Sequence, residues 1–288
     1  MKKKKLIQNR LVSYFCKNMK SKKDIDFHKR TDEELSDFIK KLELQALETA
    51  EERIPLYLDV GVKDAELILD VGCGSGFVTR DIANLTKGRV IGVDGSADMI
   101  RMATNVLEDY KNVDLCIGLA KQLPFCDNMF DIVTCNLLLM WVDKPQKVVN
   151  EMTRVTKPGG KVLASLEPDY GGKLHWPENP KVDPIFAGRA IEKKGGDPHI
   201  GRKLRLIFVR AGLETRVGIG NTRIWTCEED KHYYLHARDF YVKALRDAGL
   251  TEKEIDRWEY EYLRSLDEGV QLNFFPQFYA IGRKPMVL

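Results

Sequence analysis

The 288-residue chain lacks the features that mark several common classes of protein. Its six cysteines, at positions 16, 73, 116, 126, 135 and 227, contain no CxxC pair and no metal-ligand spacing, so we expect reduced thiols and no bound metal. No apolar run reaches the roughly 20 residues that a membrane-spanning helix needs. The stretch that follows the first lysines, residues 6–10, is too short and too polar for a signal-peptide core, which predicts a cytoplasmic protein.

Acidic residues are missing from the first 23 positions, although the net charge of the whole chain is only +3. This stretch holds nine lysine and arginine residues and so concentrates the basic excess at one end of the chain. We expect residues 1–30 to form a basic, solvated and flexible tail. Contact of this tail with nucleic acid or anionic lipid is the alternative interpretation.

The glycine spacing of dinucleotide-binding proteins is also missing from the most informative segment, residues 67–79. An apolar strand there ends at Asp70 and is followed by Gly72, Gly74 and Gly76, a turn in which the backbone can approach a ligand closely. Counted from either of the first two glycines, Gly-x-Gly-x-x-Gly lacks its third glycine. The helical spacing that follows still indicates the first strand–turn–helix unit of a nucleotide-binding α/β sheet.

A second strand, residues 88–94, ends in Asp94, eighteen positions after the last of these glycines. A carboxylate at the tip of the second strand can accept hydrogen bonds from both hydroxyls of a ribose, which makes Asp94 the strongest single candidate for nucleotide binding. Gly95 follows it, Ser96 is expected to cap the next helix, and Met99 is expected to lie against a flat base.

The pattern Asp70-x-Gly72-x-Gly74-x-Gly76 resembles motif I of the class I S-adenosylmethionine-dependent methyltransferases. Residues 118–133, the end of the fourth strand and residues 151–163 are similar to segments of the ubiquinone/menaquinone-biosynthesis (type 11) group, and the resemblance covers roughly residues 50–170 plus the last strands. It implies S-adenosyl-L-methionine as cofactor. Cofactor contacts are expected from Asp70, Gly72, Cys73, Gly74, Gly76, Asp94, Gly95, Met99, Leu119, Ala120, Lys121 and Asn136.

The same resemblance implies the fold class and the domain organisation. We expect a three-layer, Rossmann-like α/β fold with a seven-stranded, mostly parallel sheet, an antiparallel last strand and helical cap inserts. Residues 31–171 and 199–288 would form the two parts of the methyltransferase domain, separated by a substrate-side insert at 172–198. The expected elements are a leading helix within 32–53, a helix at 199–211, a strand at 214–225, a helical insert at 228–266 and a last strand at 274–282.

One residue departs from the family pattern. Members of the family usually carry an acidic residue where this chain has Leu119, and that carboxylate accepts a hydrogen bond from the adenine amino group. Leu119 cannot accept this bond, whereas the amide of Ala120 can still bond a ring nitrogen. The departure leaves open a protein that binds the cofactor without turnover.

Methyl transfer is a displacement at a sulfonium carbon, so a base is needed only when the acceptor atom must lose a proton. Candidates at the carboxyl end of the fifth strand and just beyond it are Glu167, Asp169, Tyr170 and His175. Each has a plainer alternative: the two carboxylates can bond backbone amides, the tyrosine can pack, and the histidine can lie at the surface. Trp141, at the tip of the fourth strand, is expected to shape the pocket.

The leading functional hypothesis is transfer of a methyl group to a small or medium-sized cytoplasmic molecule. A protein or RNA acceptor, recognised by the basic tail and residues 173–196 of the insert, is the first alternative, and a non-catalytic cofactor-binding regulator is the second. No Asn-Pro-Pro-Tyr signature follows the fourth strand, which argues against methylation of the amino group of adenine or glutamine, and the three-cysteine site of arsenic methyltransferases is missing. The sequence does not identify the acceptor or the oligomeric state.

Overall fold

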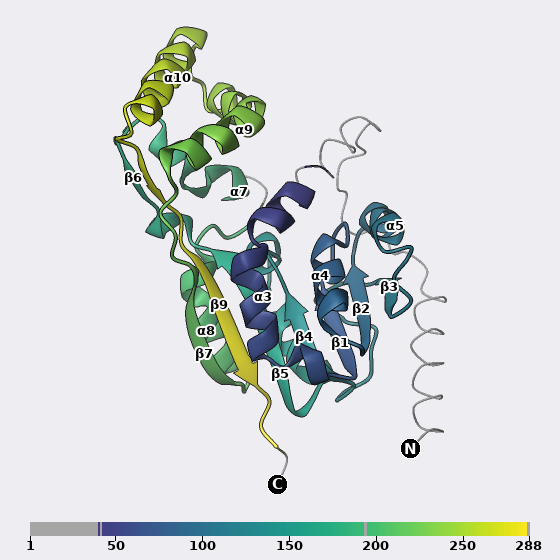
Figure 1. The fold of residues 1–288 in the computed structure, drawn as a ribbon. Helices are drawn as coiled ribbons and strands as arrows, with labels where there is room; N and C mark the ends of the chain where they lie inside the picture. The colour runs from purple at the N-terminus through teal and green to yellow at the C-terminus, as the bar shows by residue number, and fades with distance from the viewer. Residues whose placement is uncertain (1–39, 41, 193–194, 287–288) are drawn as a thin grey trace.

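The computed structural model describes residues 40, 42–192 and 195–286, and within them a twisted seven-stranded sheet forms the centre of the molecule (Figure 1). The strand order is β3-β2-β1-β4-β5-β9-β7. All pairs from β3 to β5 are parallel, whereas β9 runs antiparallel to both of its neighbours. The strands are β1 (Leu67–Val71), β2 (Arg89–Asp94), β3 (Val113–Ile117), β4 (Phe130–Cys135), β5 (Thr156–Pro168), β7 (Glu214–Asn221) and β9 (Gln277–Arg283).

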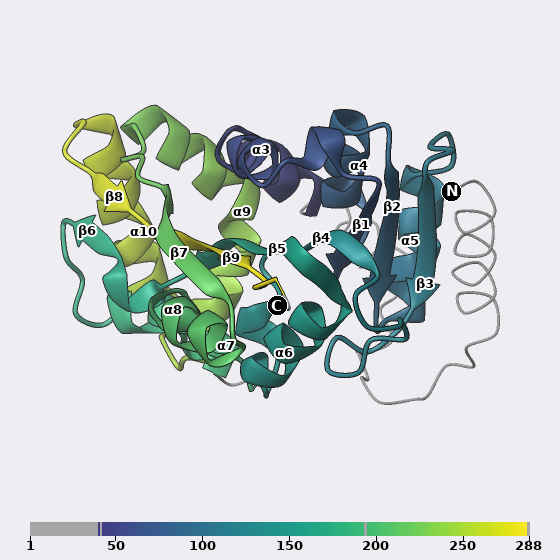
Figure 2. The same ribbon diagram turned by 90° about the horizontal axis from the view of Figure 1, so that it is seen from below.

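Helices cover both faces of the sheet, which makes three layers (Figure 2). The first face packs against α3 (Ala50–Asp59), α4 (Phe77–Leu85) and α5 (Ala97–Val106), and the second against α6 (Pro145–Val155) and α8 (Ile200–Arg210). The central strands are buried on both faces, as parallel strands in such folds are, so they consist of continuous apolar runs rather than alternating ones. Two apolar clusters, one on each face, form the core.

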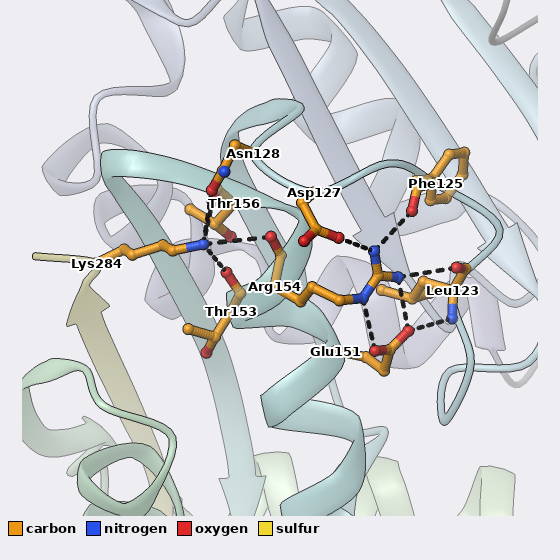
Figure 3. Close-up of polar contacts among 9 residues, drawn as sticks. All are labelled: Leu123, Phe125, Asp127, Asn128, Glu151, Thr153, Arg154, Thr156 and Lys284. Atoms are coloured by element: carbon orange, nitrogen blue, oxygen red, sulfur yellow. Dashed lines mark hydrogen bonds and ion pairs between the residues drawn. The ribbon is translucent and has the colours of Figure 1, made fainter. Parts of the chain in front are cut away.

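Two cations close the amino edge of the sheet, where β4 and β5 begin (Figure 3). The guanidinium of Arg154 pairs with Glu151 and Asp127 and donates to two carbonyl oxygens of the chain segment that leads into β4. The Nζ atom of Lys284 donates to Oδ1 of Asn128 at 2.8 Å and to three carbonyl oxygens around the end of α6. Lys284, the residue after β9, is thereby hydrogen-bonded to the chain where α6 passes directly into β5.

A separate layer, which we call the cap, lies beyond the carboxyl edge of the sheet on the β9 side (Figure 1). Threonine at the N-cap and glutamate at the third helical position form a capping box at the start of each long cap helix. Val182 and Ile185 from the insert after β5 pack with Tyr234 and Trp258 into one apolar cluster, so both inserts fold together. The cap elements are β6 (Leu174–Trp176), α7 (Ala190–Glu192), α9 (Cys227–Asp247), α10 (Glu252–Asp267) and β8 (Leu272–Phe274).

The predicted fold class is confirmed, including the antiparallel last strand of the sheet. Several element bounds differ from the prediction. The described part of the leading helix is interrupted at Thr49 and continues in α3 to Asp59, and the predicted last strand is divided between β8 and β9. The short strand β6 was not predicted, because its partner β8 lies about a hundred residues later in the chain. The basic tail at 1–30 and the start of the leading helix lie outside the described residues.

Candidate cofactor-binding site

The glycine turn after β1 is fastened to the tip of β2. The amide nitrogens of Gly72 and Cys73 both donate to the carbonyl oxygen of Val93, at 2.7 and 3.1 Å. Gly74 adopts a left-handed backbone conformation with φ of +52°, and a Cβ atom built at this position would have no atom within 4 Å. The space next to Gly74 is therefore open, as the approach of a ligand to the backbone requires.

The other two glycines of the turn have protein atoms where a side chain would lie, and both have a positive φ. A Cβ atom at position 72 would lie 2.7 Å from Cδ1 of Leu138, and one at position 76 would lie 2.9 Å from Leu107 in the loop after α5 and 3.0 Å from Ala103 within that helix. Gly76 is also the N-cap of α4. Of the three glycines, Gly74 is thus the one whose missing side chain leaves room for a ligand.

Asp94 stands directly beside this turn. Its Oδ2 atom accepts a hydrogen bond from the amide of Gly74 at 3.0 Å, and Oδ1 accepts one from the amide of Ser96 at 2.8 Å. Burial raises the pKa of Asp94, while the amides of Ser96, Gly74 and Gly95 oppose this shift. Each oxygen accepts one bond and retains a lone pair, so the carboxylate fits the hydroxyl pair of a ribose.

The start of α5 agrees with the prediction. Oγ of Ser96 accepts the amide hydrogen of Met99 at 3.3 Å, which confirms Ser96 as the N-cap. Met99 is buried in the first turn of the helix. Its contact with a flat base remains a prediction.

Asp70 and Cys73 are both buried. Asp70 is 1% exposed and accepts a hydrogen bond from the hydroxyl of Thr79 in α4 at 2.6 Å. Burial raises the pKa of Asp70 to about 6, and the Thr79 bond opposes that shift. The side chain of Cys73 packs against Gly92, where an added Cβ atom would lie 3.0 Å from Sγ of Cys73. Burial raises the pKa of the Cys73 thiol. Asp70 therefore joins β1 to α4, which is a supporting role for the turn.

The segment after β3 continues along the same edge. Its first amide, that of Gly118, donates to the carbonyl oxygen of Asp94 at 2.9 Å, and Leu119 and Ala120 are half-buried. The ammonium of Lys121 pairs with Asp143 at 2.7 Å, and this bond lowers the pKa of Asp143. Lys121 is therefore engaged with the protein, and the side chain of Leu119 offers no polar atom to a base.

The segment that follows β4 is held by side chains from β5. Oγ of Ser165 donates to Oδ1 of Asn136 at 2.9 Å. Glu167 is 0% exposed, and its carboxylate accepts hydrogen bonds from the amides of Leu138, Leu139 and Met140. Burial raises its pKa to about 7, and the three amides counteract this shift. Glu167 thus bonds backbone amides, which is the plainer of the two roles that the sequence left open.

The remaining candidate bases are also engaged. Asp169 is buried and accepts from both Nε and Nη2 of Arg202; burial would raise its pKa, but Arg202 and His199 hold it below the usual value. Tyr170 packs against Phe275 with ring centroids 4.7 Å apart, and burial raises its pKa to about 12. The raised pKa disfavours the deprotonated form of Tyr170 that a base would require, so a role in positioning or packing is favoured.

His175 lies in the cap, on β6, rather than at the tip of β5. Its Nδ1 atom is 3.3 Å from Oδ1 of Asp183, and burial lowers its pKa. The sequence missed the polar group beside it. Asp230 of α9 is 2% exposed and bonds Asn273 through Oδ1, but its Oδ2 has no partner. Burial lowers the pKa of Lys173, and the charges of Asp183 and Asp230 oppose this shift.

Other features of the described part of the chain bear on the class of protein. No three His, Cys, Asp or Glu side chains in it are grouped so as to hold a metal ion. Within the same residues no helix combines the length and apolarity needed to cross a membrane. None of the five described cysteines is in a disulfide, and three of them are buried. Trp141, which was expected at the tip of β4, ends the short 3₁₀ helix after that strand and is 45% exposed.

Comparison with known proteins assigns this part of the chain to a family. Residues 69–164, which include the glycine turn and Asp94, match the family model described as a methyltransferase domain. Residues 69–164 form a methyltransferase domain. The matched segment begins within β1, includes β2, β3 and β4, and ends within β5.

Relatives of the methyltransferase domain include an uncharacterized methyltransferase of Schizosaccharomyces pombe, 35% identical over 154 residues that cover 50% of this chain and 55% of that protein. A demethylmenaquinone methyltransferase of Bacillus cereus is 42% identical over 106 residues, covering 35% of this chain and 45% of that protein. The chain thus spans about half the length of these curated relatives.

A solved structure extends the likeness beyond the methyltransferase domain. Phosphoethanolamine N-methyltransferase 2 of Haemonchus contortus superimposes with a TM-score of 0.56 at 18% identity, over 82% of this chain and 53% of that one. At this identity the likeness shows a shared fold.

Proposed function

We propose that the protein transfers a methyl group from S-adenosyl-L-methionine to a small-molecule acceptor. The observation that carries the proposal is the Asp94–Gly74 contact next to the open space at Gly74, inside a methyltransferase domain. A carboxylate beside an unobstructed glycine backbone suits a ribose attached to a chain that passes over the turn. When bound, the cofactor supplies an electrophilic methyl group on a sulfonium.

The chain's own residues then bind and orient. Asp94 would accept from the ribose hydroxyls, the backbone at Gly74 would lie against the methionine part, and Met99, Leu119 and Ala120 would border the base. Cys73, Gly95 and Asn136 follow the carboxyl ends of β1, β2 and β4, and at these positions they would line the site. Glu167, Asp169 and Tyr170 already make hydrogen bonds or ring contacts within the protein. Alignment of the reactants and exclusion of water would therefore contribute more to the rate of methyl transfer than proton removal would.

The cap supports a small acceptor. It lies over the carboxyl edge of the sheet, which is the edge where open α/β sheets bind ligands (Figure 1). Among its described residues it also holds a buried carboxylate oxygen without a hydrogen-bond partner, Oδ2 of Asp230, and it holds the ammonium of Lys173, whose pKa is lowered by burial. The relative named for demethylmenaquinone methylation points in the same direction. A protein or RNA acceptor is the weaker alternative, since its main support was the basic tail. We also propose a cytoplasmic location, which is supported by the absence of disulfides among the five described cysteines.

The test has two steps. Calorimetry with S-adenosylhomocysteine asks whether the protein binds the cofactor product, and a fractionated cell extract with methyl-labelled cofactor asks which fraction accepts the label. Binding together with label in a small-molecule fraction is the expected result. Absence of binding would contradict the cofactor assignment, and binding without label in any fraction would favour the non-catalytic regulator. Label in protein or RNA would reassign the acceptor.

A further inference from the structure

The carboxylate of Glu167 connects strand β5 to the backbone that leaves strand β4. Its Oε1 atom accepts from the amides of Leu138 and Leu139, both at 2.9 Å, and its Oε2 atom accepts from that of Met140 at 3.3 Å. These amides begin the short 3₁₀ helix η2 (Leu139–Trp141), where backbone N–H groups have no partner within the helix. The charge thus satisfies three donors that would otherwise be buried without an acceptor.

The backbone on both sides of this contact is held in an unusual conformation. Leu137, just before the three amides, has φ of +50°, and Leu166, just before Glu167, has φ of +49°. Branched residues without a glycine's freedom rarely adopt this region, and such strain persists only where the surrounding contacts enforce it. One strained leucine lies in the segment just after β4 and the other lies within β5, and each immediately precedes one side of the contact. This placement indicates that Glu167 supplies the enforcement.

The segment held in this way rests on the glycine turn. The side chain of Leu138 covers Gly72 so closely that a Cβ atom there would be 2.7 Å from its Cδ1. On the β5 side, Oγ of Ser165 donates to the carbonyl oxygen of Cys135 at 3.2 Å and to Asn136. A shift of residues 137–140 would therefore move Leu138 relative to the turn that carries Gly74.

We propose that Glu167 is a positioning residue of the cofactor site, which holds residues 137–140 in their strained path and so keeps Leu138 against the glycine turn. The inference rests on the proposed function. It replaces the expectation that Glu167 acts as a catalytic base, since the carboxylate is 0% exposed and bonded to the protein on both oxygens.

Protonation of Glu167 should loosen this arrangement. Its pKa is raised to about 7 by burial, and a neutral carboxyl group has one acceptor oxygen fewer for the three amides. The titratable side chain that interacts with it from β4 is the Cys135 thiol, whose pKa burial also raises. From α8 and β9, Gly201 and Phe278 lie beside Glu167, and neither titrates. Cofactor affinity is therefore expected to fall as the pH is lowered through 7.

The test compares two carboxylates that both bond backbone amides. Asp131 accepts from the amides of Glu66 and Leu67 at the opposite end of β1, at 3.0 and 2.9 Å, so Asp131→Asn is the matched control for Glu167→Gln. S-adenosylhomocysteine is titrated into each full-length protein at pH 6 and pH 8, and amide hydrogen exchange is followed by mass spectrometry. Glu167→Gln should bind roughly tenfold more weakly at pH 8, lose most of the pH dependence, and exchange faster at 137–141. Asp131→Asn should retain wild-type affinity.

The outcomes distinguish failure of the proposed function from failure of the positioning role of Glu167. If the wild type does not bind S-adenosylhomocysteine, the proposed function fails. If the wild type binds and Glu167→Gln binds within about twofold of it at pH 8, or Asp131→Asn loses as much affinity as Glu167→Gln, the positioning role is wrong while the function stands. If Glu167→Gln does not fold, Glu167→Asp replaces it, because the shorter side chain keeps the charge but cannot reach all three amides. Wild-type affinity and exchange in that variant would overturn the inference.

Discussion

The amide of Gly74 donates a hydrogen bond to Asp94, with a distance of 3.0 Å between the amide nitrogen and Oδ2. This bond joins the tips of β1 and β2, which are separated in the sequence by a helix. It aims a carboxylate along the open face of the glycine turn, where φ at Gly74 is positive and no atom occupies the direction of a side chain. The two residues together therefore define where a ribose and the chain attached to it would lie.

Replacement of Asp94 by alanine is expected to weaken S-adenosylhomocysteine binding at least roughly tenfold. The variant loses the acceptor for two hydroxyls, and a hydrogen bond to a charged group contributes about 1.5–3 kcal/mol. Calorimetry measures the change. Asp98→Ala is the control, because Asp98 lies nearby in the first turn of α5, is more than half exposed and pairs with Arg101. Equal dissociation constants for wild type and Asp94→Ala would remove Asp94 from the site.

Gly74→Val should abolish binding of S-adenosylhomocysteine and leave the protein folded. The valine side chain would fill the open space and collide with the ligand rather than with the core. Gly61→Val is the matched control, since Gly61 also has a positive φ with no atom within 4 Å but lies at the turn after α3. Both variants carry backbone strain, so similar circular dichroism with loss of binding only in Gly74→Val is expected. Normal binding by Gly74→Val would count against the motif.

The site residues fall into two groups with respect to prediction from sequence. Gly74 and Asp94 were predictable, because a glycine turn after one parallel strand and a carboxylate after the next must meet at the same edge of the sheet. The role of Glu167 was not, because it depends on the pairing of β4 with β5 and on the path of residues 137–140. The pair of Asp230 with Asn273 is equally non-local, since it joins α9 to a strand that forms only with β6.

The stability of the protein should decrease as the pH rises from about 4 to 6, through the contribution of Asp70. Its pKa is raised from 3.8 to about 6 by burial, so the folded state retains a proton that the unfolded state has lost over this window. Asp70→Asn keeps an acceptor for Thr79 and removes the titration. The free energy of unfolding, measured in urea at pH 4.5 and 7, should therefore fall more for the wild type than for Asp70→Asn. A difference between the two proteins that is independent of pH, or that grows in favour of the wild type at higher pH, would refute the buried-carboxylate interpretation.

Lys284→Met is expected to destabilise the protein without affecting the cofactor site. The substitution removes the donor for four oxygens near the end of α6, three of them part-buried carbonyl oxygens, and a typical hydrogen bond contributes about 0.5–1.5 kcal/mol (Figure 3). Urea unfolding should report this loss, and S-adenosylhomocysteine affinity should remain that of the wild type, because the contact lies at the amino edge of the sheet. An unchanged free energy of unfolding would show that water replaces the ammonium without penalty.

Leu119, which we propose borders the adenine base, stands where the methyltransferase pattern that this sequence resembles usually has an acidic residue. A side chain without an acceptor should discriminate poorly between S-adenosylhomocysteine and its deaminated, inosine-type analogue, because a large penalty arises only when a buried donor is left unpaired. Leu119→Asp should restore preference for the adenine form, and Leu119→Met, which changes shape but adds no acceptor, should not. The ratio of the two dissociation constants, measured for each protein by calorimetry, is the deciding quantity. A wild type that already prefers adenine by roughly a hundredfold, or about 2.7 kcal/mol, must receive the acceptor from another group, and Leu119 would then not face the amino group.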